Sequence, residues 1–350
     1  MLGQRVTAAV LYNKTDISAD LATFLKQLNY TDNLSGEADT LDLMLEDRAG
    51  LWQSTWFPDK GAMLDVTVNT LNWGALYGGA ASLRLGQFEV DELTSSGYPS
   101  EVQIRSVSIP SNNKLRGVER TRSWEKAELK TIANDVASGA GMELVFDTQE
   151  NPKLERTEQA QQSDLSFLLA LTKDHGLALK IHDNKVVIFD EADYEKKEPQ
   201  ITIVKPGTFV TPEAGKAYIT EILGYSMSNK NRDIYKACHV RYQKSKKKAI
   251  VEATFTDQNK KDGKTLEVRE QVETVADAER LAKKRLREKN KEEWTASFSL
   301  MGNLNLIASS TIALSGFGVF DGNYLIVRAT HSIGSGYHTN IEIRRCLDGY

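Results

Sequence analysis

The chain has 350 residues, of which 26% are charged and 40% are apolar, and its formal net charge is −4. This length is enough for two or three domains with their own cores, and the composition is that of an ordinary globular protein. The charge balance excludes a general attraction to nucleic acid or anionic membranes, and no window holds the roughly 20 apolar residues of a membrane-spanning helix.

Residues 1–112 are predicted to form a β domain. In "TLDLMLEDR", Leu41, Leu43 and Leu45 alternate with Asp42, Met44 and Glu46, which is the period of a strand with one buried face. In "SLRLGQFEVDELTSSG" the apolar phase changes beside Gly86, which predicts a β-bulge. "SADLATFLKQLNY" fits both a helical stripe and a strand, so we expect a short turn of helix that runs into a strand.

Residues 113–195 have the pattern of a small α/β domain. "SWEKAELKTIANDVASGAG" has helical spacing, with Ser123 as a candidate cap, and "MELVFD" follows as a strand. "SDLSFLLALTKDHG" predicts a second helix that ends at Gly176. "LALKIHDNKVVIF" predicts two strands joined by Asp183 and Asn184, residues that tolerate the positive φ of a two-residue turn.

Residues 196–216 are predicted to be a linker, and β patterns return over 217–350. One helix interrupts them at about 274–293, where Thr274 and Asp277 have the spacing of a capping box. The predicted class is therefore mainly β with an α+β insert: two β-barrel domains, 1–112 and 217–350, flank the α/β domain at 113–195.

The stretch "KVVIFDEADYEK" contains the letters D-E-A-D at residues 190–193, which in many helicases follow a buried strand and hold magnesium. An ATPase also needs a phosphate-binding loop, G-x-x-x-x-G-K-[ST], and the chain has none. "DGKT" at 262–265 lacks the first glycine. We interpret the stretch as the beginning of an acidic linker.

The sequence gives little support for a metal site or an enzyme active site. Cys238 and His239 are neighbours on a strand and point to opposite faces, so they cannot share a metal ion. His331 and His338 flank a glycine-rich turn, but two histidines without a carboxylate or thiolate make a weak metal site. No nucleophile elbow or zinc-protease motif is present, although carboxylate pairs remain open among 48 acidic residues. We predict no enzyme activity, catalytic residue, cofactor or metal.

The remaining chemical cues are a basic run and the cysteines. "YQKSKKKA" carries Lys244, Lys246, Lys247 and Lys248, and we interpret it as a solvated hairpin tip rather than a specific nucleic-acid site. The cysteines are far apart with no C-x-x-C pair, so we expect reduced thiols and synthesis in a reducing cytoplasm.

Three segments resemble the phage late-control D proteins, which are the hubs of contractile-tail baseplates. They are "YTDNLSGEADTLDLMLEDRAGLWQSTWFPDKG", "SDLSFLLALTKDHGLALKIHDNKVVIF", and the ending from "ASFSLMG" to "YHTNIEI". The branch that the segments resemble is that of Gram-positive phages, defective prophages and phage-tail-like bacteriocins. The family-signature residues that the resemblance carries over are Asp32, Asn33, Gly36, Asp39, Glu46, Asp47, Arg48, Trp52, Asp321, Gly322, Tyr324 and His331.

The resemblance implies a structural function and a set of partners. Hubs of this family are trimers in which each chain supplies two tail-tube-like barrels, so that three chains adapt a sixfold tail tube to a threefold central spike. The expected partners are two further copies of the chain, a hexameric tail tube protein and a spike protein, with tape-measure and baseplate-wedge proteins as further neighbours. Assembly would occur in the bacterial cytoplasm, and the product would be part of the phage or bacteriocin particle. The alternatives are a type VI secretion-like spike component and a cell-wall-degrading or host-binding tail protein.

Overall fold

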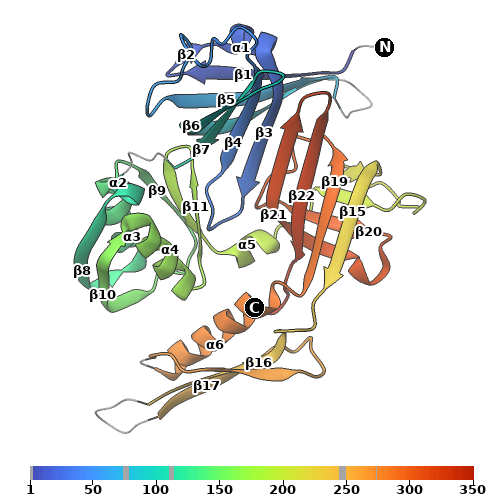
Figure 1. The fold of residues 1–350 in the computed structure, drawn as a ribbon. Coiled ribbons are helices and arrows are strands. Elements are labelled where there is room, and N and C mark those ends of the chain that lie inside the picture. Colours follow the sequence, from blue (N-terminus) through green and yellow to red (C-terminus); the bar gives the residue numbers. More distant parts are fainter. Residues whose placement is uncertain (1–2, 74–78, 110–113, 244–249, 273) are drawn as a thin grey trace.

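The computed structural model describes residues 3–73, 79–109, 114–243, 250–272 and 274–350, and it is mainly β, as predicted (Figure 1). Fourteen strands from the two ends of the chain form one continuous sheet. The α/β insert lies on one side of this sheet, and a helix-on-sheet unit lies beyond its end. Within the described ranges, no helix is both long enough and apolar enough to span a membrane.

The first β half contains helix α1 (Ser18–Phe24), which runs directly into strand β3, as predicted. Leu41, Leu43 and Leu45 are buried, and the strand pairing shifts beside Gly86, so the predicted strand and bulge are both confirmed. The strands are β1 (Arg5–Tyr12), β2 (Thr15–Asp16), β3 (Leu25–Asn33), β4 (Thr40–Glu46), β5 (Met63–Leu71), β6 (Ala80–Ser96) and β7 (Glu101–Val107).

The second β half comes from the C-terminal part of the chain. Strand β13 lies within the stretch predicted as a linker: its alternating apolar residues are buried, so this part belongs to the sheet. The elements are β13 (Ile201–Val204), β14 (Ala217–Ile219), β15 (Ile222–Asn229), β19 (Trp294–Met301), β20 (Thr311–Ser315), the 3₁₀ turn η1 (Gly318–Phe320), β21 (Gly322–Ile333) and β22 (Tyr337–Arg345).

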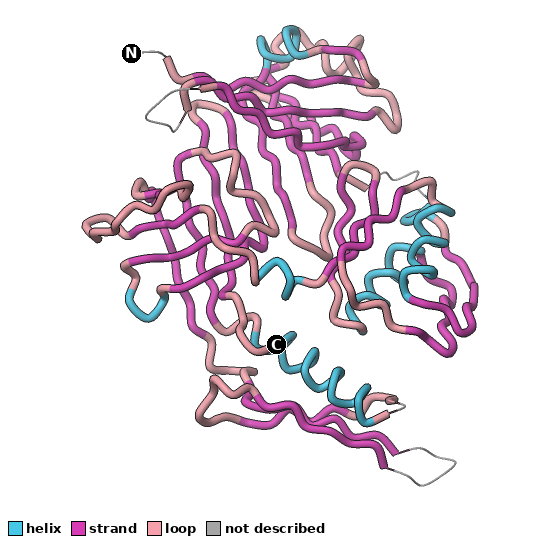
Figure 2. The backbone as a smooth tube through the Cα atoms, turned by 180° about the vertical axis from the view of Figure 1, so that it is seen from behind, coloured by secondary structure: helices cyan, strands magenta, loops and turns pink. Residues whose placement is uncertain are grey.

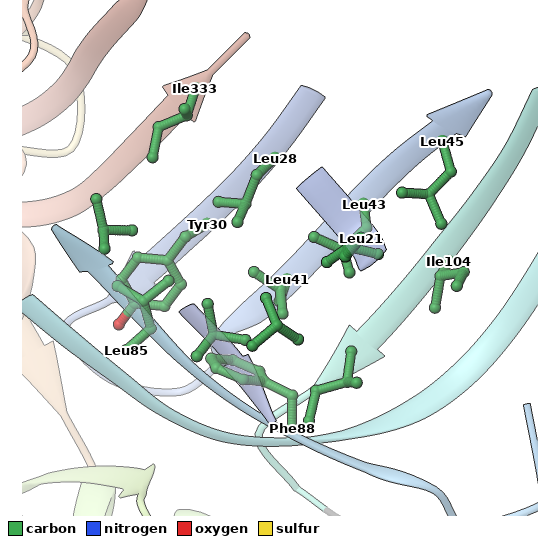
Figure 3. Close-up of a cluster of buried hydrophobic side chains, with 14 of the residues drawn as sticks. Leu21, Leu28, Tyr30, Leu41, Leu43, Leu45, Leu85, Phe88, Ile104 and Ile333 are labelled. Carbon is green, nitrogen blue, oxygen red and sulfur yellow. The ribbon is translucent and has the colours of Figure 1, made fainter. Parts of the chain in front are cut away.

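The two halves repeat the same strand order. The first runs β5-β6-β7-β4-β3 across the sheet, and the second runs β20-β21-β22-β19-β15. They are joined because β3 pairs antiparallel with β21. Ile333 of β21 therefore lies in the core of the first half, beside Leu28 and Tyr30 (Figure 3). The strand pairs of the described residues do not close either half into a separate barrel.

The insert contains the predicted helices and strands together with a two-stranded antiparallel sheet, residues 119–128 paired with 153–163, that the sequence pattern missed. Ser123 and Trp124 lie in this sheet rather than at a helix start, and the helix begins at Leu129. The predicted turn at Asp183 and Asn184 has positive φ at both residues. The elements are α2 (Lys114–Gly117), β8 (Glu119–Glu128), α3 (Leu129–Gly139), β9 (Glu143–Asp147), β10 (Lys153–Ser163), α4 (Asp164–Asp174), β11 (Ala178–His182), β12 (Lys185–Phe189) and α5 (Glu191–Glu195).

A separate unit extends from the second half (Figure 2). Strands β16 (Tyr235–Gln243), β17 (Ile250–Thr256) and β18 (Lys264–Val268) form their own three-stranded sheet, and helix α6 (Val275–Asn290) packs on it. The predicted capping box at Thr274 is present. The sequence pattern assigned these strands to the C-terminal barrel, but they do not join its sheet. The basic run at 244 and 246–248 lies outside the described residues.

Candidate functional site

Four of the signature residues lie where the three parts of the chain meet, in and beside the β3–β4 loop. Asp32 and Asp39 are both buried. Lys180 of the insert forms an ion pair with Asp32, and its Nζ lies 3.3 Å from Asp39 Oδ2. The backbone N–H of Ala308, from the second half, donates to Asp32 Oδ2 at 2.8 Å. Asp32 therefore contacts both other parts of the chain, and we name Asp32, Asp39 and Lys180 the junction triad.

The charges of the junction triad depend on one another. Burial raises the pKa of Asp32, because a carboxylate loses its hydration there, and the nearby Lys180 ammonium opposes this rise. Burial also acts to lower the pKa of Lys180. The carboxylates of Asp32 and Asp39 outweigh this effect, so the pKa of Lys180 is raised. The lysine is thus held in its charged form by two buried carboxylates, and it compensates both.

The β3–β4 loop is fixed to strand β11 of the insert by further hydrogen bonds. The N–H of Gly36 donates to the Leu179 carbonyl at 3.2 Å. His182 Nδ1 lies 3.2 Å from Asp39 Oδ2. Ser108 Oγ accepts from the N–H of Asp39 at 3.0 Å. The insert is therefore attached to the first half through β11, an edge strand of its three-stranded sheet.

The same loop is fixed to the second half by an arginine of β21. Arg328 Nε donates to Asn33 Oδ1 at 2.9 Å, and its Nη2 donates to Glu37 at 2.8 Å. A polar groove of about 760 Å³ opens beside this contact and continues to Glu191 and Lys291. The groove carries both acidic and basic side chains, so its charge does not single out an anionic or a cationic ligand.

The D-E-A-D stretch forms the short helix α5, which joins the insert to the second half. Asp190 caps it by accepting a hydrogen bond from the N–H of Ala192 at 2.8 Å. Glu191 accepts from Arg344 at 2.7 Å, and Glu195 forms ion pairs with Arg344 and with Arg287 of α6. The stretch connects the insert to the second half, as a linker would, but it is an ordered helix in which Glu191 and Glu195 form largely buried ion pairs.

The signature residues after β4 form a local turn rather than a part of the junction. Asp47 Oδ1 accepts from the N–H of Trp52 at 3.2 Å. Glu46 and Arg48 form an exposed ion pair. Trp52 is buried and packs edge-on against Trp56 with ring centroids 5.4 Å apart. These contacts indicate a role in fixing the turn.

The signature residues at the start of β21 have a similar role. Asp321 Oδ1 accepts from the N–H of Phe317 at 2.7 Å, and the hydroxyl of Tyr324 donates to the Phe320 carbonyl at 2.9 Å. Gly322 has a φ of +135°, which favours glycine. These residues shape the 3₁₀ turn and the start of β21.

His331 is buried at the seam between the two halves. Its Nδ1 lies 2.7 Å from the Tyr337 hydroxyl, and its Nε2 lies 3.1 Å from the Leu306 carbonyl. A neutral ring with its proton on Nε2 satisfies both contacts. His338 is paired with Ser332, the neighbour of His331, and the described residues contain no cluster of three or more metal-ligating side chains.

The buried histidine predicts a fall in stability at acid pH. Burial lowers the pKa of His331 to about 4, whereas an unfolded histidine titrates near 6.5. As the pH falls below 6.5 the unfolded chain binds a proton that the folded chain does not bind, so the contribution is full above pH 6.5 and is lost toward pH 4. We expect a loss of about 3 kcal/mol over this range. Urea titrations across the range should show a smaller loss for His331→Gln, and equal losses would contradict the assignment.

The bulge at Gly86 predicts a second measurable effect. Gly86 has a φ of +99°, and a Cβ atom there would lie 3.3 Å from Cε1 of His182 in the insert. Gly86→Ala is therefore expected to lower the free energy of unfolding by about 1–3 kcal/mol. Gly139→Ala is the matched control, because it meets no atom within 4 Å at the end of α3. Equal urea midpoints for the two variants would contradict the strain at Gly86.

Several residues of the site were not found by sequence reasoning. Lys180 is a charged residue inside the apolar strand "LALKIH", and this mismatch is a signal that could have identified it. Glu195, Arg287 and Arg344 give no comparable local signal, because each lies in a polar stretch and acquires its partner only through the fold.

The family model and the curated relatives that match this chain, and two solved structures of similar fold, all describe tail proteins. A sequence model of the family described as "Phage tail baseplate hub (GPD)" matches residues 110–337, which is more than half of the chain. The probable baseplate hub protein of Escherichia phage P2 is 28% identical over 201 residues, which cover 56% of this chain and 49% of that protein. The chain thus spans about half the length of the curated relatives that it matches.

Two solved structures share the fold over nearly the whole chain. The tail protein from Neisseria meningitidis MC58 has a TM-score of 0.71 at 11% identity, with 98% of this chain and 97% of that chain covered. The 43 kDa tail protein of prophage MuSo2 from Shewanella oneidensis has a TM-score of 0.70 at 14% identity, with 98% and 99% covered. At these identities the likeness concerns the fold alone.

Proposed function

Because the chain belongs to the phage tail baseplate hub family, we propose that it is a structural protein of a contractile-tail baseplate. Three copies would form a ring between a sixfold tail tube and a threefold central spike. The observation that supports this most directly is the repeated strand order of the two β halves. Three copies of such a chain present six similar β units, which matches the symmetry of a hexameric tube.

The junction and the α5 cluster have a mechanical purpose in this proposal. A symmetry adapter must hold its two β halves at a fixed angle, because an error in this angle would prevent the ring from closing. Pairing between β3 and β21 joins the halves directly. The junction triad then fixes the insert, and Glu195, paired with Arg344 of β22 and Arg287 of α6, fixes the α6 unit to the same framework. The chain would act without catalysis, cofactor or metal, and the signature residues would be structural.

The proposed partners are a tail tube protein on one face of the ring and a spike protein on the other, with tape-measure and wedge proteins as further neighbours. Assembly would take place in the bacterial cytoplasm before the particle leaves the cell.

The proposal is tested by the mass of the assembled protein. The purified chain, alone and mixed with candidate tube and spike proteins of the same particle, is measured by native mass spectrometry or light scattering. We expect three copies, each of 39.0 kDa, in the complex with a partner. A monomer under all of these conditions would contradict the ring.

A further inference from the structure

The two β halves repeat each other in their irregularities as well as in their strand order. The pairing of β3 with β4 shifts between Leu25 and Gln27, and the pairing of β15 with β19 shifts at the matching place, between Ile222 and Gly224. Bulges are specific features of a strand. Their coincidence aligns the two strands residue by residue, so that Thr31 of β3 corresponds to Ser228 of β15.

Strands β6 and β21 correspond in the same way. The pairing of β6 with β7 shifts between Val90 and Glu92, and the pairing of β21 with β22 shifts between Ile326 and Arg328. A glycine with positive φ precedes each bulge at the same distance, namely Gly86 at +99° and Gly322 at +135°.

A hydrogen bond to the neighbouring strand is repeated too. The N–H of Val90 donates to the Ala62 carbonyl, and the N–H of Ile326 donates to the Ser310 carbonyl, both at 2.9 Å. On this alignment Thr94 of β6 corresponds to Thr330 of β21.

One strand pairing has no second counterpart among the described residues. Strand β3 pairs with the second part of β21, where Thr31 lies opposite Thr330 and their hydroxyl oxygens are 3.4 Å apart. The corresponding edges are β15 and residues 91–96 of β6. No strand of the described ranges pairs with either edge: β15 pairs with β19 alone, and residues 91–96 pair only with β7.

The β15 edge carries exposed apolar side chains, because Leu223 and Tyr225 are 55% and 49% exposed, and Tyr98, in the turn that follows residues 91–96, is fully exposed. An open strand edge with apolar side chains is a site for pairing with another chain. Within the chain, β3 pairs with β21. Because β15 corresponds to β3 and β6 corresponds to β21, this internal pairing shows that a strand like β6 fits an edge like β15.

We propose that β15 of one copy pairs antiparallel with residues 91–96 of β6 in the next copy, and this rests on the proposed assembly of several copies. In the register transferred from β3 and β21, Ser228 lies opposite Thr94 and Lys230 lies opposite Glu92. The second pair has opposite charges, which favours this register. Each copy offers one edge of each type, so the copies join head to tail, as a closed ring requires.

The test is disulfide cross-linking between two differently tagged, co-expressed full-length chains, one with Thr94→Cys and the other with Ser228→Cys. Directly opposite residues have Cα atoms about 4.5–5.5 Å apart, which a disulfide can bridge. After oxidation in the presence of the tube and spike proteins, we expect a two-chain product that contains both tags. It should be about tenfold more abundant than with Ser95→Cys in place of Thr94→Cys, because residue 95 points to the other face of the strand.

Two controls make the outcome decisive. Thr31→Cys with Thr330→Cys in a single chain should form a bond within that chain, which shows that the geometry permits a disulfide. The unaltered chain gives the background from Cys238 and Cys346. A trimer by mass without the two-chain product, or with equal product from the shifted pair, would overturn this pairing and leave the proposed ring intact. A monomer under all conditions would overturn both.

Discussion

Lys180→Met is expected to lower the free energy of unfolding by about 3–5 kcal/mol, because it leaves two buried carboxylates without their shared cation. Asp32 and Asp39 are 4% and 0% exposed, so water cannot replace the lysine. The methionine side chain fills a similar volume, which limits the contribution of a cavity. The measurement is urea unfolding followed by tryptophan fluorescence at neutral pH.

The neighbouring strand supplies a matched control for this experiment. Lys185 of β12 pairs with Glu143 at 3.1 Å, but both side chains are largely exposed. Lys185→Met is expected to change the free energy by less than about 1 kcal/mol. Adding Asp32→Asn to Lys180→Met should recover part of the loss, because one buried charge is then removed. Equal losses for Lys180→Met and Lys185→Met would show that the junction triad does not support the fold.

Arg344→Met is expected to have an effect of similar size at the α5 cluster, about 3–5 kcal/mol. Arg344 and Glu195 are each 3% exposed in their side chains, and Arg344 also contacts Glu191 at 2.7 Å. The carboxylates raise the pKa of Arg344, although its burial acts in the opposite direction. Without the arginine, Glu195 retains Arg287, whereas Glu191 retains only the more distant Lys291 at 3.8 Å among the ion pairs of the described residues.

Two further variants separate charge from geometry at this cluster. Arg344→Lys should recover only part of the stability, because a lysine cannot direct two separate nitrogens at two carboxylates. Lys196→Met, on the exposed side next to α5, should have an effect below about 1 kcal/mol, since Lys196 and Asp193 are largely solvated. Full recovery by lysine, or a large effect of Lys196→Met, would contradict this account.

Local patterns in the sequence were sufficient where the structure itself is local. The alternation of Leu41, Leu43 and Leu45, the capping box at Thr274 and the turn at Asp183 each depend on residues that are close in sequence. The bulge at Gly86 was visible as a change of phase. Family membership followed from longer segments, although the matching family model begins at residue 110 and therefore does not include the signature residues between Asp32 and Trp52.

The remaining features depend on partners that are distant in sequence. Trp124 was assigned to a helix because its spacing to later apolar residues fits the helical period, but it lies on strand β8 and stacks on Phe167 with ring centroids 5.2 Å apart. The separate sheet of β16, β17 and β18 has the same alternation as any other sheet, so its independence was not visible. Lys180 and Asp32 are 148 positions apart, and no local pattern specifies such a pair.

The pairing of β3 with β21 has a consequence for the order of events during synthesis. Ile333 and Tyr337 complete the core around Leu28 and Tyr30, so the ribosome must translate as far as residue 337 before the first half can bury its whole apolar face. The growing polypeptide therefore carries an unfinished hydrophobic surface for about 300 residues after Leu28 and Tyr30 have been made. A product truncated before residue 333 would keep that surface open, and it would depend on chaperones or be degraded.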